Sequence, residues 1–132
     1  MVSYRTPLAR ARGLGAAKHG AGHWLSERVT SIALVPLSLW AVVAALRLSK
    51  AGYDGAVAWL HDPVNAVLSV LLLAVGFQHM HAGLRVVVED YIHTPLDRSV
   101  LLLVNLFVCV LGAALAIFCI LKVALAAAVI AS

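Results

Sequence analysis

Residues 64–88 have the sequence VNAVLSVLLLAVGFQHMHAGLRVVV, and this apolar run of 25 residues decides the fold. A helix of roughly 20 apolar residues crosses the hydrocarbon core of a bilayer, which is about 30 Å thick. A second run of this kind precedes it and a third follows it. The sequence therefore predicts three transmembrane helices, at about residues 25–49, 63–92 and 98–130.

The composition of the whole chain is typical of a membrane protein. Of its 132 residues, 63% are hydrophobic and 12% are charged, and the mean hydropathy is +0.98. A soluble domain of this size cannot bury so much apolar surface, whereas a bilayer accepts it. We therefore expect an all-α integral membrane protein, with a basic N-terminal tail at residues 1–22 and a single three-helix membrane domain at residues 23–132.

Local signals indicate where the second helix begins and ends. Asp62 followed by Pro63 is typical of a helix start, because the aspartate caps free N–H groups and proline fits the first helical position. Thr94 precedes Pro95, and a residue before proline resists helical geometry, so we expect the helix to end before this pair. Pro36 lies inside the first helix and predicts a kink there.

The basic residues are distributed unevenly between the two sides of the membrane. The side shared by the N-terminal tail and the second loop holds Arg5, Arg10, Arg12, Lys18, Arg28 and Arg98, and the other side holds Arg47, Lys50 and Lys122. The positive-inside rule then predicts a multi-pass protein of the bacterial inner membrane with a cytoplasmic N-terminus. A mitochondrial inner-membrane location is the alternative, because residues 1–22 are rich in arginine and lack acids. We expect membrane lipids, and no nucleic acid, as partners of these charges.

The second helix concentrates the polar side chains, which are costly in a bilayer and therefore functional candidates. They are Gln78, His79, His81, Arg85, Glu89, Asp90 and Tyr91. At about 100° per residue, positions eleven apart differ by only about 20°, so His79 and Asp90 share a face. His81 points nearly the opposite way, on the face of Arg85. Eleven residues also put His79 about 16 Å from Asp90, near the bilayer midplane.

An imidazole at that depth suits an axial ligand of a haem iron. Gly83 follows His79 by one turn and removes a side chain beside it. The alternative is a core histidine that is hydrogen-bonded to another helix. A haem with two histidine ligands needs a second deep imidazole, and the first and third helices contain none. We therefore expect a heteromeric helical bundle, shared with another membrane protein that supplies it.

The predicted cytoplasmic end of the bundle carries three further candidates. Asp90 and Tyr91 combine a carboxylate and a phenol, which could bind and protonate a quinone head. Arg28, at the same membrane face, could pair with a haem propionate. The alternatives are the solvated end of a helix for Asp90, an aromatic-belt residue for Tyr91 and a positive-inside anchor for Arg28. Cys109 and Cys119 have no metal or disulfide spacing and are interpreted as packing residues.

Two segments of the chain resemble a known family. In residues 79–93, the pattern H-x-H-x-G is followed by D-Y-I-H, and residues 23–29 have the sequence HWLSERV. Together they resemble the hydrophobic membrane anchor of succinate dehydrogenase, respiratory complex II, in its mitochondrial and alphaproteobacterial branch. The number of helices and the short basic tail agree with this family over essentially the whole chain.

The resemblance implies a role for each candidate residue. His79 would be one axial ligand of haem b, and the cytochrome b556 subunit would supply the other. Tyr91 would hydrogen-bond a carbonyl oxygen of ubiquinone, with Asp90 beside it in the protonation path. Arg28 would contact a haem propionate or border the quinone site. His81 is an alternative ligand, which its position on the opposite face disfavours.

The resemblance also implies the enzyme to which the chain contributes. The flavoprotein subunit would hold FAD and the iron–sulfur subunit would hold the clusters. This chain would then be one part of succinate:quinone oxidoreductase and not an enzyme alone. The complex would join the tricarboxylic acid cycle to the respiratory chain. The alternatives are a haem-free anchor, an anchor of fumarate reductase and a non-redox accessory membrane protein.

Overall fold

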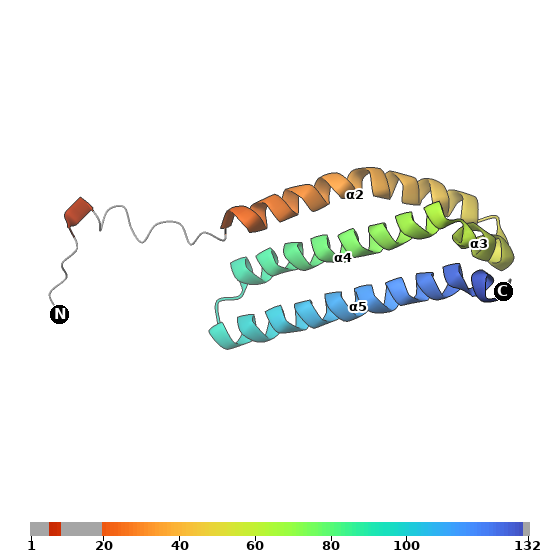
Figure 1. The fold of residues 1–132 in the computed structure, drawn as a ribbon. Helices are drawn as coiled ribbons and strands as arrows, with labels where there is room; N and C mark the ends of the chain where they lie inside the picture. Colours follow the sequence, from red (N-terminus) through yellow and green to blue (C-terminus); the bar gives the residue numbers. More distant parts are fainter. Residues whose placement is uncertain (1–5, 9–19, 131–132) are drawn as a thin grey trace.

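The computed structural model describes residues 6–8 and 20–130. The long described part folds entirely into helices and turns, with no strand among the described residues. Its helices are α2 (Gly20–Leu48), α3 (Gly52–His61), α4 (Pro63–Tyr91) and α5 (Pro95–Ile130) (Figure 1).

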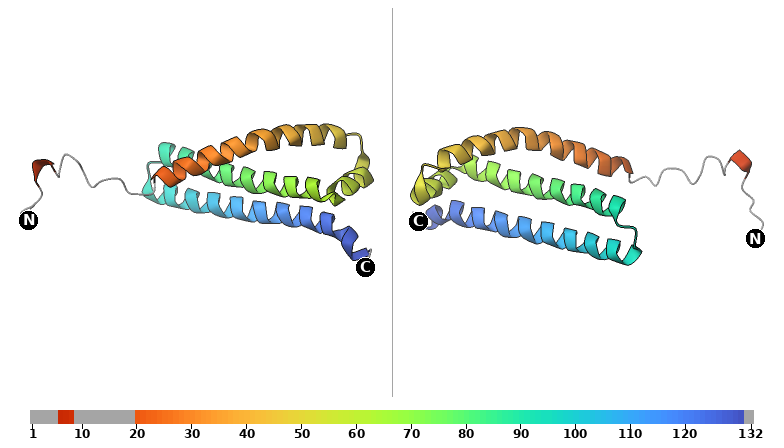
Figure 2. Two further views of the ribbon diagram at one scale, coloured as in Figure 1. Left: turned by 45° about the horizontal axis from the view of Figure 1, so that its top comes forward. Right: turned by 180° about the vertical axis from the view of Figure 1, so that it is seen from behind.

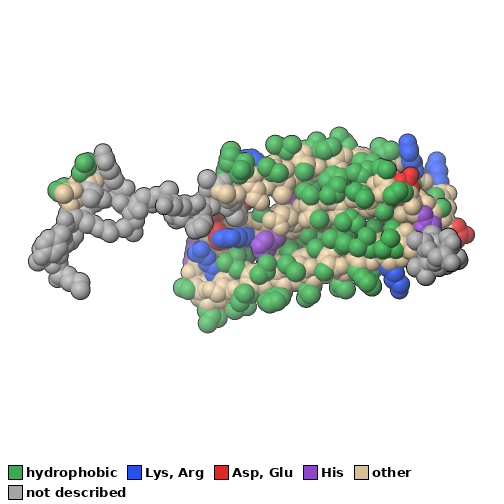
Figure 3. Space-filling view, viewed as in Figure 1, with side chains coloured by type: hydrophobic (Ala, Val, Ile, Leu, Met, Phe, Trp, Pro, Cys, Tyr) green, Lys and Arg blue, Asp and Glu red, His purple; other side chains and the backbone are tan. Residues whose placement is uncertain are grey.

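Three of these helices are long and apolar enough to cross a membrane. The candidate spans are Trp24–Leu48 in α2, Pro63–Tyr91 in α4 and Pro95–Ala126 in α5. No more than about a tenth of each span is buried inside the chain itself. Apolar side chains cover the outside of the helices instead (Figure 3). The expected all-α fold with three transmembrane helices is thereby confirmed.

The short helix α3 was not predicted. Its ten residues are too few to span, and it lies at the end of the bundle where α2 and α4 are joined (Figure 1). Gly52, at a φ of +65°, takes a left-handed conformation that favours glycine and turns the chain into α3. Trp59 of α3 then stacks on Trp40 of α2, with ring centroids 5.6 Å apart. Tertiary packing of this kind leaves no periodic signal in the sequence.

The helix ends differ from the prediction at two places. The helix α5 begins at Pro95, three residues before the predicted start at 98, because proline fits the first turn and Arg98 N–H already donates to Thr94 O at 3.0 Å. The helix α2 begins at Gly20, inside the segment predicted as the tail. The rest of that tail, apart from residues 6–8, lies outside the described residues.

The predicted start of the second span is present. Asp62 Oδ1 accepts a hydrogen bond from Val64 N–H at 2.8 Å, and Pro63 occupies the first turn of α4. At the other end α4 stops at Tyr91, before the Thr94–Pro95 pair. In α2, Pro36 lies within the helix, which arches along its length (Figure 1).

The three spans lie in a row with α4 in the middle. The helix α4 packs against both α2 and α5, and the described parts of α2 and α5 do not contact each other (Figures 1 and 2). Small residues are buried where the helices meet: Ala44, Ala66, Ala82 and Cys109. Small side chains let helix backbones approach closely in a membrane. The sides of α4 that face neither α2 nor α5 are therefore not covered by the chain itself.

Candidate functional site

His79 lies in α4 on the side that faces α2. Its Nδ1 is 3.1 Å from the hydroxyl Oγ1 of Thr30, which belongs to α2. Its Nε2 has no hydrogen-bond partner among the described residues. The bond to another helix, which the core-histidine interpretation requires, is therefore present, but it occupies only one of the two ring nitrogens.

The surface of α4 beside His79 is open. Gly76 and Gly83 lie one turn on either side of it and are related by about 20° around the helix axis. A Cβ atom built on either glycine would have no neighbouring atom within 4 Å. The two glycines thus leave a strip of α4 without side chains next to the imidazole, where a planar group or another helix can pack closely.

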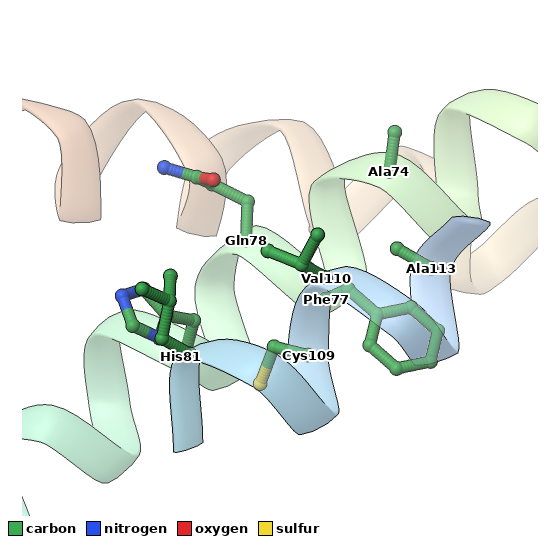
Figure 4. Close-up of a pocket in the computed structure, with 8 residues that line it drawn as sticks. Ala74, Phe77, Gln78, His81, Cys109, Val110 and Ala113 are labelled. Carbon is green, nitrogen blue, oxygen red and sulfur yellow. The ribbon is translucent and has the colours of Figure 1, made fainter. Parts of the chain in front are cut away.

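His81 faces the opposite way, toward α5. It lines a cavity of about 130 Å³ together with residues that include Gln78, Phe77 and Cys109 (Figure 4). Its Nδ1 is buried and has no hydrogen-bond partner in the described part of the chain. The two imidazoles therefore contact different helices, as their separation of about 200° around the axis predicts.

Asn105 is a polar residue of α5 that the sequence argument overlooked. It is buried, with 8% of its surface exposed, and its Nδ2 donates to the backbone carbonyl of His81 at 3.0 Å. Its Oδ1 accepts from Cys109 Sγ at 3.3 Å. The signal was available, because a lone asparagine within a long apolar run needs a partner in the membrane. It joins α5 to α4 at the level of the two histidines.

Asp90 and Tyr91 stand together at the last turn of α4. Both side chains are exposed, Tyr91 with 77% of its surface accessible. Neighbouring Glu89 pairs with Arg85, with Oε1 and Nε 2.8 Å apart. Since α4 continues unbroken, Asp90 lies about 16 Å along the axis from His79. The structure therefore does not bring the phenol–carboxylate pair and the deep imidazole into one site.

Arg28 lies nearer the level of His79 than the sequence suggested. The contact of Thr30 with His79 sets the register between α2 and α4. Arg28 precedes Thr30 by two residues, or about 3 Å along α2. Along the axis Arg28 is therefore closer to the level of His79 than to that of Asp90, and it lies on the same side of His79 as Asp90. Its guanidinium lies over the ring of Trp24, 5.5 Å from the centroid.

The three candidate spans define a multi-pass helical membrane protein. His79, whose Nδ1 contacts Thr30 and whose Nε2 has no partner among the described residues, is its candidate cofactor ligand. The family model for the succinate dehydrogenase/fumarate reductase transmembrane subunit matches residues 2–130. The chain therefore belongs to this family, and the resemblance carried by residues 23–29 and 79–93 is confirmed.

Individual relatives agree with the family. The succinate dehydrogenase hydrophobic membrane anchor subunit of Rickettsia conorii is 31% identical over 109 residues, which cover 81% of this chain and 86% of the relative. The protein of the same name from Rickettsia felis is 33% identical over 102 residues, 76% of this chain and 84% of the relative. That of Paracoccus denitrificans is 32% identical over 93 residues, 68% of this chain and 70% of the relative. No solved structure matches the chain.

Proposed function

We propose that this chain is the hydrophobic membrane anchor of a succinate:quinone oxidoreductase, and that it co-ligates a haem b and helps to form the ubiquinone reduction site. The observation that carries the proposal is the state of His79: one ring nitrogen is held by α2 and the other has no partner among the described residues. Its relatives from Rickettsia and Paracoccus, named as anchor subunits of succinate dehydrogenase, support the choice of complex.

The residues around His79 fit a haem. The strip at Gly76 and Gly83 offers a flat surface next to the imidazole. Arg28 lies about 3 Å along its helix from the residue that contacts His79, so its guanidinium can reach a propionate. A bound haem would supply a one-electron carrier within the bilayer. This chain's own part is to hold the ring by one imidazole and to neutralise a carboxylate.

The second imidazole must come from a partner. Of the histidines whose side chains are described, His81 faces α5, and His61 and His93 are exposed outside the spans. We assign the second ligand to the cytochrome b556 subunit, packed on the open side of α4. The flavoprotein subunit with FAD and the iron–sulfur subunit with its clusters complete the enzyme, because this chain has no cysteine pattern for a cluster.

Quinone reduction is assigned to the far end of α4. The Tyr91 phenol donates a hydrogen bond to a carbonyl oxygen of ubiquinone, which orients the ring and stabilises the charge it gains. Asp90 is exposed at the membrane surface, where its carboxylate can exchange protons with water and pass them inward. With the N-terminus in the cytoplasm, or in the matrix if the protein is mitochondrial, this end faces the compartment that supplies the protons.

Replacement of each histidine tests the haem assignment. In the assembled complex, His79→Ala is expected to abolish the low-spin b-type haem spectrum, because α4 carries no other imidazole on that face. His81→Ala is the matched control, two residues away on the same helix, and should keep the haem. Loss of the spectrum in the His81 variant but not in the His79 variant would move the ligand to the side of α5. A haem unaffected by both would mean that neither histidine ligates it, which would leave an accessory anchor.

A further inference from the structure

The hydroxyl group of Thr30 has three polar neighbours. Its Oγ1 is 3.1 Å from His79 Nδ1, 2.9 Å from the carbonyl oxygen of Ser26 and 3.1 Å from that of Glu27. A hydroxyl carries a single hydrogen and can accept through its lone pairs. A carbonyl oxygen can only accept. Whether Nδ1 of His79 donates or accepts therefore depends on which atom receives the single hydrogen of the hydroxyl.

The backbone of α2 offers two acceptors for this hydrogen, the carbonyl oxygens of Ser26 and Glu27. Threonine in a membrane helix commonly donates to the carbonyl four residues earlier, which here is that of Ser26. The Glu27 carbonyl already accepts from the hydroxyl of Ser31 at 2.7 Å. Once Thr30 donates to Ser26, its lone pairs point at His79. The contact of 3.1 Å is then a hydrogen bond only if Nδ1 carries the hydrogen.

We infer that Thr30 is a positioning residue that holds His79 in the tautomer with its hydrogen on Nδ1. This inference rests on the proposed haem function. A neutral imidazole has one N–H and one lone pair, so a hydrogen on Nδ1 leaves the lone pair on Nε2, the nitrogen without a partner in the described part of the chain. In the other tautomer Nε2 would carry the hydrogen and could not bind iron without losing it.

The same hydrogen bond fixes the orientation and the basicity of the ligand. An acceptor for the second ring N–H makes an imidazole more electron-donating, and it prevents the ring from turning. Electron donation stabilises the oxidised iron more than the reduced iron. Thr30 therefore lowers the midpoint potential of the haem, and it does so from α2, a different helix from the one that carries the ligand.

Two substitutions of Thr30 and one of its neighbour separate this role from simple packing. Thr30→Val keeps the shape and removes the hydroxyl, whereas Thr30→Ser keeps the hydroxyl and removes the methyl group. Ser31→Ala is the matched control, because Ser31 makes the same kind of hydroxyl-to-backbone bond on the same turn of α2. The complete complex is purified for each variant, and the haem per complex, the midpoint potential and the electron paramagnetic resonance spectrum of the oxidised haem are measured.

In Thr30→Val we expect a higher midpoint potential and an altered resonance spectrum, with haem retention weaker by roughly ten- to a hundredfold. Thr30→Ser and Ser31→Ala should match the wild type in all three. If Thr30→Val does not assemble, Thr30→Ala removes the same hydroxyl, and the same changes are expected. A Thr30→Val complex with the wild-type potential, spectrum and haem content would overturn the inference and leave the haem function intact. A wild-type complex without haem would overturn both.

Discussion

A histidine in the middle of a membrane helix has two ring nitrogens to satisfy and no water to satisfy them. In this chain His79 meets one need through Thr30 on the neighbouring helix and leaves the other open. His79 is half-buried, and a polar group without a partner where no water reaches costs free energy on the order of 1–3 kcal/mol, which favours a ligand at the open nitrogen. The hydroxyl hydrogen of Thr30 can go to the backbone of α2, so that Nδ1 of His79 is the donor in the hydrogen bond between the two side chains.

The spacing of the polar residues predicted part of this arrangement. A separation of eleven residues places Asp90 on the face of His79, and a separation of two places His81 on the other. The partners could not be predicted in the same way. Thr30 lies in another helix, and its pairing with His79 depends on the register of α2 against α4, which no local period contains.

Tyr91→Phe tests the quinone role at the scale of one hydroxyl group. A neutral hydrogen bond contributes about 1 kcal/mol, so its loss should slow quinone reduction by about five- to tenfold. Oxidation of succinate by artificial acceptors should not change, since it bypasses the membrane part of the complex. Tyr53→Phe is the control, because Tyr53 is an exposed tyrosine of α3 at the opposite end of the bundle. Quinone kinetics equal to those of the wild type in the Tyr91 variant would remove its role.

At the scale of elements, the central helix α4 carries almost every candidate residue. Its start could be predicted because the signal is local: the side chain of Asp62 accepts from Val64 N–H two residues later, and Pro63 fits the first turn. The helix α3 could not, because it is stabilised by contacts with other helices, such as the stacking of Trp59 on Trp40. The length and position of α4 thus follow from the sequence, whereas the packing of the connection around it does not.

Removal of the cap at Asp62 should destabilise the end of α4 that lies far from the proposed quinone site. Asp62→Ala deletes the oxygen that accepts from Val64 N–H and should cost about 1 kcal/mol. Asp62→Asn keeps a side-chain oxygen at this position and should stay within a few tenths of a kcal/mol of the wild type. Denaturant titration in detergent, followed by circular dichroism, measures the difference. Equal stability of the alanine and asparagine variants would exclude a capping role.

At the scale of the whole molecule, the three spans form an open row rather than a closed bundle. The described parts of α2 and α5 do not contact each other, and the chain itself buries only a small part of each span. The sequence predicted the number of spans, because length and apolar content suffice for that. It also indicated a missing partner, since one deep imidazole on the haem-facing side is half of the expected pair. The row itself could not be predicted, because most side chains of every span are apolar and their pattern does not show which side packs on a neighbour.

The most direct test of the account is the absorption spectrum of the intact protein. The tagged chain is purified from its native membrane in mild detergent, and a dithionite-reduced minus air-oxidised spectrum is recorded. We expect sharp α and Soret bands of a low-spin b-type haem, together with a second membrane protein in the preparation. A flat spectrum from a preparation that retains all its partners would contradict the assignment of His79 as a haem ligand.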